Sequence, residues 1–327
     1  MDARLLGRTG LQVTTLGFGC GNVGGLMVRG TPADRERAVA RALELGINYF
    51  DTAPSYGDGL SERHLGQALK ALRVSPLVGT KVRVPPGEFG DIRGAVGRSL
   101  EASLGRVGLE RVDLLQLHNP IALERGRGTV ALKDVLDDVA SAMQGLQRQG
   151  KVRFWGITAL GDTVALHHVL GSGKIDTAQV CYNLLNPSAG LEAPPGLAGQ
   201  DFGRLLDGAR GHRVGVIGIR ALAAGALSGT VARHPVAAPA VDPIASGREY
   251  AADVAHAQRL QALVREGHAE SLIEAALRFV VSHDAVSTVL VGYSSLEQLE
   301  TAAAAVARGP LPAESLGRLQ ALWRQIA

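Results

Sequence analysis

Short apolar runs alternate along the chain with longer segments in which apolar residues recur at helical spacing. The apolar runs occupy residues 15–19, 47–50, 77–81, 112–118, 154–158, 177–182, 214–219 and 287–291. Between two of these runs, Ile92, Val96, Leu100 and Leu104 mark one face of a helix that is predicted to end at Gly108. This repeated alternation of strand and helix predicts an α/β fold, the closed (β/α)8 TIM barrel, rather than an open sheet.

The two ends of the chain carry elements outside this repeat. Residues 4–14 are predicted to form a short hairpin whose turn contains Gly10. Residues 316–326, with Leu319 and Trp323 on one side, predict an extra helix packed outside the barrel. Because no linker composition interrupts the 327 residues, we expect one domain that spans residues 1–327.

Charge and cysteine content narrow the possible partners and location. The formal charge of +3 at pH 7 is small and the basic residues are scattered, which argues against nucleic acid or a membrane as a partner. No segment has the pattern of a signal peptide or a membrane span. Cys20 and Cys181 form no CxxC motif, so we expect reduced thiols and a cytoplasmic location. No HxH motif occurs, and His167 and His168 are adjacent on a predicted helix, so we expect no metal site.

The stretch from residue 47 to residue 70 joins a strand to a helix through a polar loop. Its β-branched and aromatic run ends in Asp51, and the glycines that follow cannot continue a central strand. Ser61 is predicted to be the N-cap of the next helix. Asp51 and Tyr56 are therefore expected on a strand-to-helix loop.

Two other apolar strands also end in polar side chains. Lys81 ends the strand at 77–81, and His118 ends the strand at 112–118. The carboxyl ends of barrel strands meet on one rim, and this is where ligands bind in such folds. We therefore expect Asp51, Tyr56, Lys81 and His118 to converge on one catalytic rim.

These four side chains suit the reduction of a carbonyl group. Hydride transfer to an aldehyde or ketone requires a proton donor for the nascent alkoxide, and Tyr56 can supply that proton. Lys81 would favour the phenolate of Tyr56, since a nearby cation lowers the pKa of a phenol. Asp51 would keep Lys81 charged and oriented, and His118 would hydrogen-bond the carbonyl oxygen.

Three segments that contain these residues resemble the defining motifs of a known family. FDTAPSYG, GTKV and DLLQLHNP are similar to motifs of the aldo-keto reductases, and the resemblance extends over nearly the whole chain. It implies the catalytic roles given above. The segments GLSERHLGQALKAL and KVRFWGITAL resemble the branch that contains sugar 1-dehydrogenases, which would imply oxidation of an aldose to its lactone.

The resemblance also implies the residues that bind a nicotinamide cofactor. These are Thr158, Gln179, Arg220, Leu222, Gly225, Leu227, Gly292, Ser294 and Gln298. Gln179 matches the glutamine that binds the nicotinamide carboxamide, and Thr158 keeps a hydroxyl beside it. Gly292, Ser294 and Gln298 match positions at the adenosine end. The chain departs from the family at 301–302, where Thr-Ala replaces a Glu-Asn pair that often contacts adenine.

The choice between NADP(H) and NAD(H) stays open at this point. A 2′-phosphate requires a nearby basic residue, and residues 292–300 contain neither Arg nor Lys. Arg233, in the long loop at 229–249, is the nearest alternative that the sequence offers. The usual preference of the family leads us to expect NADP(H), with NAD(H) as the second possibility.

Two other functions compete with carbonyl reduction. Lys81 in a barrel would also suit a Schiff-base aldolase, although that function leaves Asp51, Tyr56 and Gln179 without roles. A redox sensor or regulatory subunit that binds the cofactor but turns over slowly is the third candidate. A small carbonyl compound or sugar is the expected substrate, and the sequence does not indicate the oligomeric state.

Overall fold

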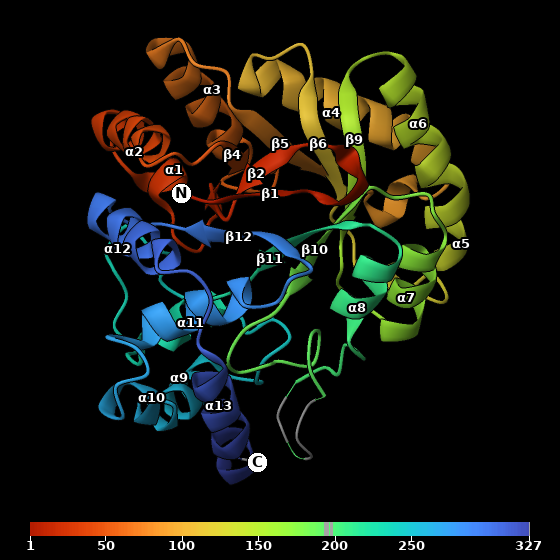
Figure 1. The fold of residues 1–327 in the computed structure, drawn as a ribbon. Coiled ribbons are helices and arrows are strands. Elements are labelled where there is room, and N and C mark those ends of the chain that lie inside the picture. Colours follow the sequence, from red (N-terminus) through yellow and green to blue (C-terminus); the bar gives the residue numbers. More distant parts are fainter. Residues whose placement is uncertain (193–195, 197–198, 327) are drawn as a thin grey trace.

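Eight parallel strands form a closed barrel with helices around it (Figure 1). The computed structural model describes residues 1–192, 196 and 199–326. The barrel strands are β3 (Leu16–Gly19), β4 (Tyr49–Asp51), β5 (Leu77–Val82), β6 (Val112–Leu117), β9 (Val152–Thr158), β10 (Thr177–Cys181), β11 (Gly215–Ile219) and β12 (Val286–Gly292). They follow one another around the barrel in this order, and β12 pairs with β3 to close it. The predicted TIM barrel is confirmed.

The helices form a ring outside these strands (Figure 1). They are α1 (Leu26–Arg29), α2 (Pro32–Glu44), α3 (Leu60–Leu72), α4 (Ile92–Val107), α5 (Leu132–Asp134), α6 (Ala140–Arg148), α7 (Thr163–Gly171), α8 (Leu205–Gly211), α9 (Tyr250–Arg259), α10 (Ala262–Arg265), α11 (Leu272–Val281) and α12 (Leu296–Ala307). The predicted C-terminal helix is α13 (Ala313–Ile326). In the part of the chain that the structure describes, no helix is long and apolar enough to cross a membrane.

The predicted N-terminal hairpin is also present. Strands β1 (Ala3–Leu5) and β2 (Gln12–Thr14) pair in antiparallel register, and Gly10 has the left-handed φ of 73° that the turn requires. Leu6, Leu11 and Val13 pack with side chains that point into the barrel. The hairpin therefore covers the end of the barrel at which the strands begin, and leaves the opposite rim for ligands.

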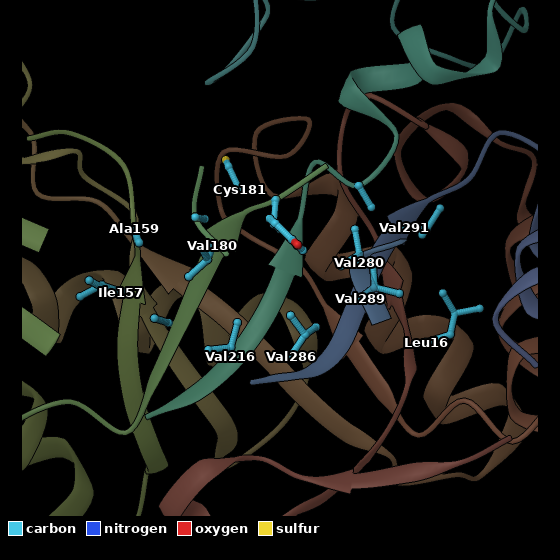
Figure 2. Packing of buried hydrophobic residues seen from close by; sticks show 14 of the residues in the cluster. Leu16, Ile157, Ala159, Val180, Cys181, Val216, Val280, Val286, Val289 and Val291 are labelled. Carbon is cyan, nitrogen blue, oxygen red and sulfur yellow. The ribbon is translucent and has the colours of Figure 1, made fainter. Parts of the chain in front are cut away.

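Successive residues of each strand face two different cores. Val216 and Val289 belong to the large cluster between strands and helices, and the adjacent Ile217 and Leu290 belong to the smaller cluster inside the barrel. Figure 2 shows Val216, Val286 and Val289 on the neighbouring strands β11 and β12. Because a buried parallel strand is covered on both faces, its sequence is a continuous apolar run, and this made the strands recognisable.

The start of α3 differs from the prediction. Gly59, with a φ of 81°, is the N-cap, and Ser61 lies inside the helix. The Ser61 hydroxyl is buried and donates to the carbonyl oxygen of Cys20 at 2.8 Å, and its oxygen lies 2.8 Å from the Thr52 hydroxyl. Instead of capping α3, Ser61 ties the start of that helix to the ends of β3 and β4.

Candidate active site

A buried ion pair lies at the carboxyl end of β4 and β5. Lys81 Nζ donates to Asp51 Oδ1, and the two side chains are only 2% and 5% exposed. Lys81 Nζ also donates to the carbonyl oxygen of Thr52 at 2.8 Å. Asp51 is the last residue of β4 and Lys81 lies near the end of the adjacent β5, so the paired strands bring the two charges together.

Tyr56 lies above this pair, on the loop between β4 and α3. The centroid of its ring is 4.9 Å from Lys81 Nζ, and the ring of His118, just after β6, is 6.1 Å away at 89°. The loop turns back through left-handed conformations at Gly57, Asp58 and Gly59, with φ values of 59°, 51° and 81°. These turns bring Tyr56 back over the barrel, so that the four predicted residues share one rim.

Burial dominates the ionisation of Tyr56 and His118. Burial raises the pKa of Tyr56 above its ordinary value even though Lys81 acts to lower it, so the expected net lowering by Lys81 is not what the structure indicates. Burial alone would lower the pKa of Lys81, but Asp51 and Tyr56 outweigh it and the net pKa is raised. Burial, together with the positive charges of Lys81 and Arg83, lowers the pKa of His118 to about 3. At neutral pH, Tyr56 is therefore protonated, Lys81 is charged and His118 is neutral.

The second carboxylate oxygen of Asp51 accepts two further hydrogen bonds. The hydroxyl of Tyr49 donates to Asp51 Oδ2 at 2.9 Å, and Gln179 Nε2 donates to the same atom at 2.7 Å. Gln179 Oε1 in turn accepts from the Thr158 hydroxyl at 3.1 Å. Tyr49 was not among the predicted site residues, because it belongs to an apolar strand and a tyrosine there indicates packing.

A cavity of about 860 Å³ opens in front of Tyr56 and His118. Of the predicted cofactor-binding residues, eight line it: Thr158, Gln179, Arg220, Leu222, Gly225, Gly292, Ser294 and Gln298. Leu227 is buried in the hydrophobic core and Lys81 lies behind Tyr56, so neither is part of the lining. The cavity extends from the rim that carries Tyr56 and His118 to the first turns of α12, where Glu297 and Thr301 line it.

Arg220 enters the cavity from a strained piece of backbone. It follows β11 with a φ of 57°, in the left-handed region that non-glycine residues rarely occupy. Asn183 Nδ2 donates to the carbonyl oxygen of Arg220 at 2.9 Å and supports this conformation. Burial lowers the pKa of Arg220, but an arginine remains charged at neutral pH. Such strained positions often cluster at functional sites.

Arg233 holds the long loop against the rest of the cavity wall. Its Nε donates to the carbonyl oxygen of Ala238 at 2.6 Å, and its Nη1 donates to that of Ala224 at 2.9 Å. Its guanidinium carbon also lies 5.2 Å from the centroid of the Tyr250 ring. Arg233 is thus engaged with the protein itself, although it lines the cavity.

Ser294 and Gln298 are also engaged with the protein at the far end of the cavity. The Ser294 hydroxyl donates to the carbonyl oxygen of Gly24 at 2.6 Å, and the Ser294 amide donates to Gln298 Oε1 at 2.8 Å. These contacts join α12 to the glycine-rich loop after β3. Asn22, on that same loop, also lines the cavity, and its Oδ1 is buried and has no hydrogen-bond partner among the described residues.

Comparison with known proteins assigns the chain to a family. Residues 15–324 match the Aldo/keto reductase family. L-galactose dehydrogenase from Arabidopsis thaliana is 32% identical, with 97% of this chain and 90% of that protein covered. D-threo-aldose 1-dehydrogenase from a Pseudomonas species is 32% identical over 58% of this chain and 63% of that protein. The holo form of an aldo-keto reductase from Bacillus halodurans has a TM-score of 0.73 at 28% identity, over 98% of this chain and 96% of that one. The chain belongs to the aldo/keto reductase family and is an oxidoreductase.

Proposed function

We propose that this enzyme interconverts a carbonyl group and an alcohol of a small substrate, with a nicotinamide cofactor and with Tyr56 as general acid and base. The observation that carries the proposal is that Tyr56 lines the cavity while Lys81 Nζ lies 4.9 Å from its ring, on the buried side. Asp51 and His118 complete the set of groups that carbonyl reduction requires.

The residues that line the cavity fit a ligand that carries amide and hydroxyl groups. Gln179 uses one N–H and one oxygen lone pair within the protein, so a second of each is left for a carboxamide. Asn22 Oδ1 is a buried acceptor without a protein partner in the described structure, and it suits a hydroxyl donor. The volume lies toward the upper end of the range of about 300–1,000 Å³ that ligand pockets span.

The bound cofactor would supply or accept the hydride, and side chains of the protein donate or accept the proton. In reduction, the Tyr56 hydroxyl gives its proton to the carbonyl oxygen as negative charge develops there. The Lys81 cation stabilises the resulting phenolate, and Asp51 holds Lys81 in place. Neutral His118 can donate one ring N–H to the same carbonyl oxygen and orient it.

We propose an aldose as the substrate, oxidised at C1 to its lactone. Two relatives named for the oxidation of sugars, L-galactose dehydrogenase and D-threo-aldose 1-dehydrogenase, support this choice. The C1 hydride would pass to the oxidised cofactor, and the C1 hydroxyl proton would pass to the Tyr56 phenolate. Oxidation therefore needs Tyr56 in the form that the raised pKa disfavours, so it should be fastest in alkaline solution.

We propose NAD(H) as the preferred cofactor, although the sequence led us to expect NADP(H). Arg233, the basic residue that the sequence offered for a 2′-phosphate, already donates to three backbone carbonyl oxygens, those of Ala238, Ala224 and Val23. Glu297, in the first turn of α12, is part of the cavity lining, and an acidic side chain there favours a ribose hydroxyl over a phosphate. NADP(H) remains the alternative.

The contacts of Lys81 weigh against a Schiff-base aldolase. A nucleophilic lysine must reach the substrate as a neutral amine, whereas Lys81 is buried, ion-paired with Asp51 and absent from the cavity lining. Borohydride should therefore trap no substrate on the protein. We also infer a cytoplasmic location, because Cys20 and Cys181 are both free thiols, as is usual in a reducing compartment.

A substrate screen in both directions tests the function. Aldehydes with reduced cofactor, and aldoses with oxidised cofactor, are followed by the absorbance of the reduced nicotinamide with NAD and NADP separately. We expect repeated turnover, fastest with an aldose and NAD. No turnover of any carbonyl compound or aldose would contradict the proposal, and a single slow turnover would favour the redox sensor.

A further inference from the structure

Tyr49 is a buried tyrosine whose hydroxyl has a specific partner. It lies in β4, two residues before Asp51, so both side chains point into the barrel. Its side chain is fully buried, and its hydroxyl donates to Asp51 Oδ2 at 2.9 Å. A phenylalanine would fill the same space, so packing alone does not account for the hydroxyl.

Neighbouring strands leave room for this phenol. A Cβ atom at Gly79, in the adjacent β5, would lie 2.5 Å from the Tyr49 hydroxyl oxygen. A Cβ atom at Gly17, in β3 on the other side, would lie 3.3 Å from Tyr49 Cδ1. Since real Cβ atoms essentially never approach within 3.0 Å, the glycine at position 79 is required for the phenol to reach Asp51.

The hydrogen bonds to Asp51 determine how Lys81 is oriented. Tyr49 and Gln179 both donate to Oδ2, so Lys81 is left with Oδ1. A second N–H of Lys81 donates to the Thr52 carbonyl oxygen. An ammonium group has three N–H donors, and the third is then left for the side on which Tyr56 lies.

We propose that Tyr49 is a positioning residue for the reaction, which it supports by fixing the Asp51 carboxylate so that Lys81 faces Tyr56. This inference rests on the proposed function, because it assigns Tyr49 to the same proton transfer. Tyr49 touches neither the cavity nor the substrate, and it acts only through Asp51 and Lys81.

The substitution Tyr49→Phe tests the inference because it removes one oxygen and keeps the ring. We expect kcat to fall about 10- to 100-fold, the range for loss of one hydrogen bond to a charged group. The KM for the cofactor should stay within about twofold, because Tyr49 lies outside the cavity. Tyr182→Phe is the matched control, since Tyr182 is also buried but packs against Phe279 and His283 away from the cavity, and its kcat should be unchanged.

Two readouts separate positioning from packing. With one donor fewer on Asp51, Lys81 is less well held toward Tyr56 and lowers the pKa of that phenol less, so the alkaline limb of kcat for reduction should move to higher pH. Arg220 and His118 also face Tyr56 and are unchanged. In a Lys81→Met background, Tyr49→Phe should cost little more, because its effect passes through Lys81. Thermal unfolding of each variant is measured alongside.

The outcomes distinguish this inference from the proposed function. If the wild-type enzyme turns over but Tyr49→Phe keeps its kcat and its alkaline limb, only the role of Tyr49 is overturned. The same holds if the losses from Tyr49→Phe and Lys81→Met simply add. If the wild-type enzyme reduces no carbonyl compound and oxidises no aldose, the proposed function fails and the role of Tyr49 fails with it.

Discussion

Lys81 Nζ lies 4.9 Å from the centroid of the Tyr56 ring, with the Lys81 side chain buried and Tyr56 at the cavity. Tyr56 is part of the cavity lining and Lys81 is not. Lys81 can therefore influence the proton on Tyr56 without contacting the carbonyl compound. The arrangement favours general acid catalysis by Tyr56 over covalent catalysis by Lys81.

The substitution Tyr56→Phe tests the proton donor directly. It keeps the ring and removes the hydroxyl, so the developing alkoxide loses its proton source. We expect kcat to fall about 10² to 10⁴-fold, the usual contribution of general acid catalysis, while cofactor affinity changes little. Steady-state kinetics and a cofactor titration by fluorescence measure the two effects.

Lys81→Met provides the companion test. It should also suppress turnover, because Tyr56 then lacks the cation that stabilises its phenolate. Combined with Tyr56→Phe, the loss should be much smaller than the product of the two separate losses, since both act on one proton transfer. A Tyr56→Phe enzyme that kept most of its activity with every substrate would instead show that another group donates the proton.

The pH dependence should reflect Tyr56 and not His118. Burial raises the pKa of Tyr56 above its ordinary value of about 10, so reduction, which uses the protonated phenol, should be level near neutrality and decline only in strongly alkaline solution. Oxidation uses the phenolate and should rise about tenfold per pH unit below that pKa. The pKa of His118 is about 3, so His118 should give no inflection between about pH 5 and 8. Profiles of kcat in both directions check this, and a limb of reduction centred near pH 7 would contradict it.

The free energy of unfolding should depend on the ionisation of His118 at acidic pH. The pKa of about 3 in the folded protein lies below the value of about 6.5 for an unfolded chain, so the unfolded state binds the proton more readily. His118 therefore lowers the free energy of unfolding as pH falls from about 6.5 toward 3. Urea unfolding of the wild type and of His118→Gln between these pH values measures this effect. The difference in the free energy of unfolding between the two proteins should change in this pH range and be constant above it.

The sequence motifs were sufficient to predict most residues of the rim. The contacts between residues far apart in the sequence could not be predicted. Asp51, Lys81 and His118 could be placed because each ends an apolar run, and parallel strands align their carboxyl ends. The hydrogen bond from Tyr49 to Asp51 could not be predicted. The alternation of side chains along β4 places both residues on the inner face of the barrel, but it does the same for every second residue of every strand, so it does not identify which of them form hydrogen bonds. The N-cap assignment of Ser61 was wrong because Gly59 adopts a left-handed conformation and starts the helix two residues earlier.

The degree of burial and the hydrogen-bond partners of the site residues could not be predicted from the sequence either. The net effect on Tyr56 depends on how much water the fold excludes, and the sequence showed only the neighbouring charge of Lys81. Arg233 could be named as a basic residue of the long loop, but not its bonds to the carbonyl oxygens of Ala224 and Ala238. Leu227 matched a cofactor position, yet it follows the left-handed turn at Gly225 and packs into the core.

Cofactor preference should change when the charge of Glu297 is reversed. Glu297→Lys replaces a carboxylate at the cavity with an ammonium group, which should favour NADP over NAD by about 1 to 3 kcal/mol through a charge-assisted contact with the phosphate. Glu300→Lys is the control, because Glu300 lies on the same helix but pairs with Arg41 outside the cavity. The ratio of kcat/KM for the two cofactors measures the change. An unchanged ratio in Glu297→Lys would show that other residues distinguish the 2′-phosphate of NADP from the ribose hydroxyl of NAD.

The last prediction concerns the buried carboxylate that supports β5 behind Lys81. Glu62 in α3 is fully buried; it accepts from the Thr80 hydroxyl and from Arg106 Nε, both at 2.6 Å. Arg106→Leu would leave this carboxylate without its cation. We expect the free energy of unfolding to fall by about 3 kcal/mol, at the low end for a buried pair because Arg106 is 22% exposed.

Arg98, an exposed arginine that also donates to two side chains, is the control for that change. Arg98 pairs with Glu88 and Asp91 on the surface, so Arg98→Leu should cost at most about 1 kcal/mol, as exposed ion pairs do. Urea denaturation of both variants measures the two losses. Because breaking a buried pair costs more than replacing it, Glu62→Leu combined with Arg106→Leu should recover part of the stability lost in Arg106→Leu alone. Equal losses in the two single variants would mean that Glu62 is solvated in the absence of Arg106, and that the pair does not support β5.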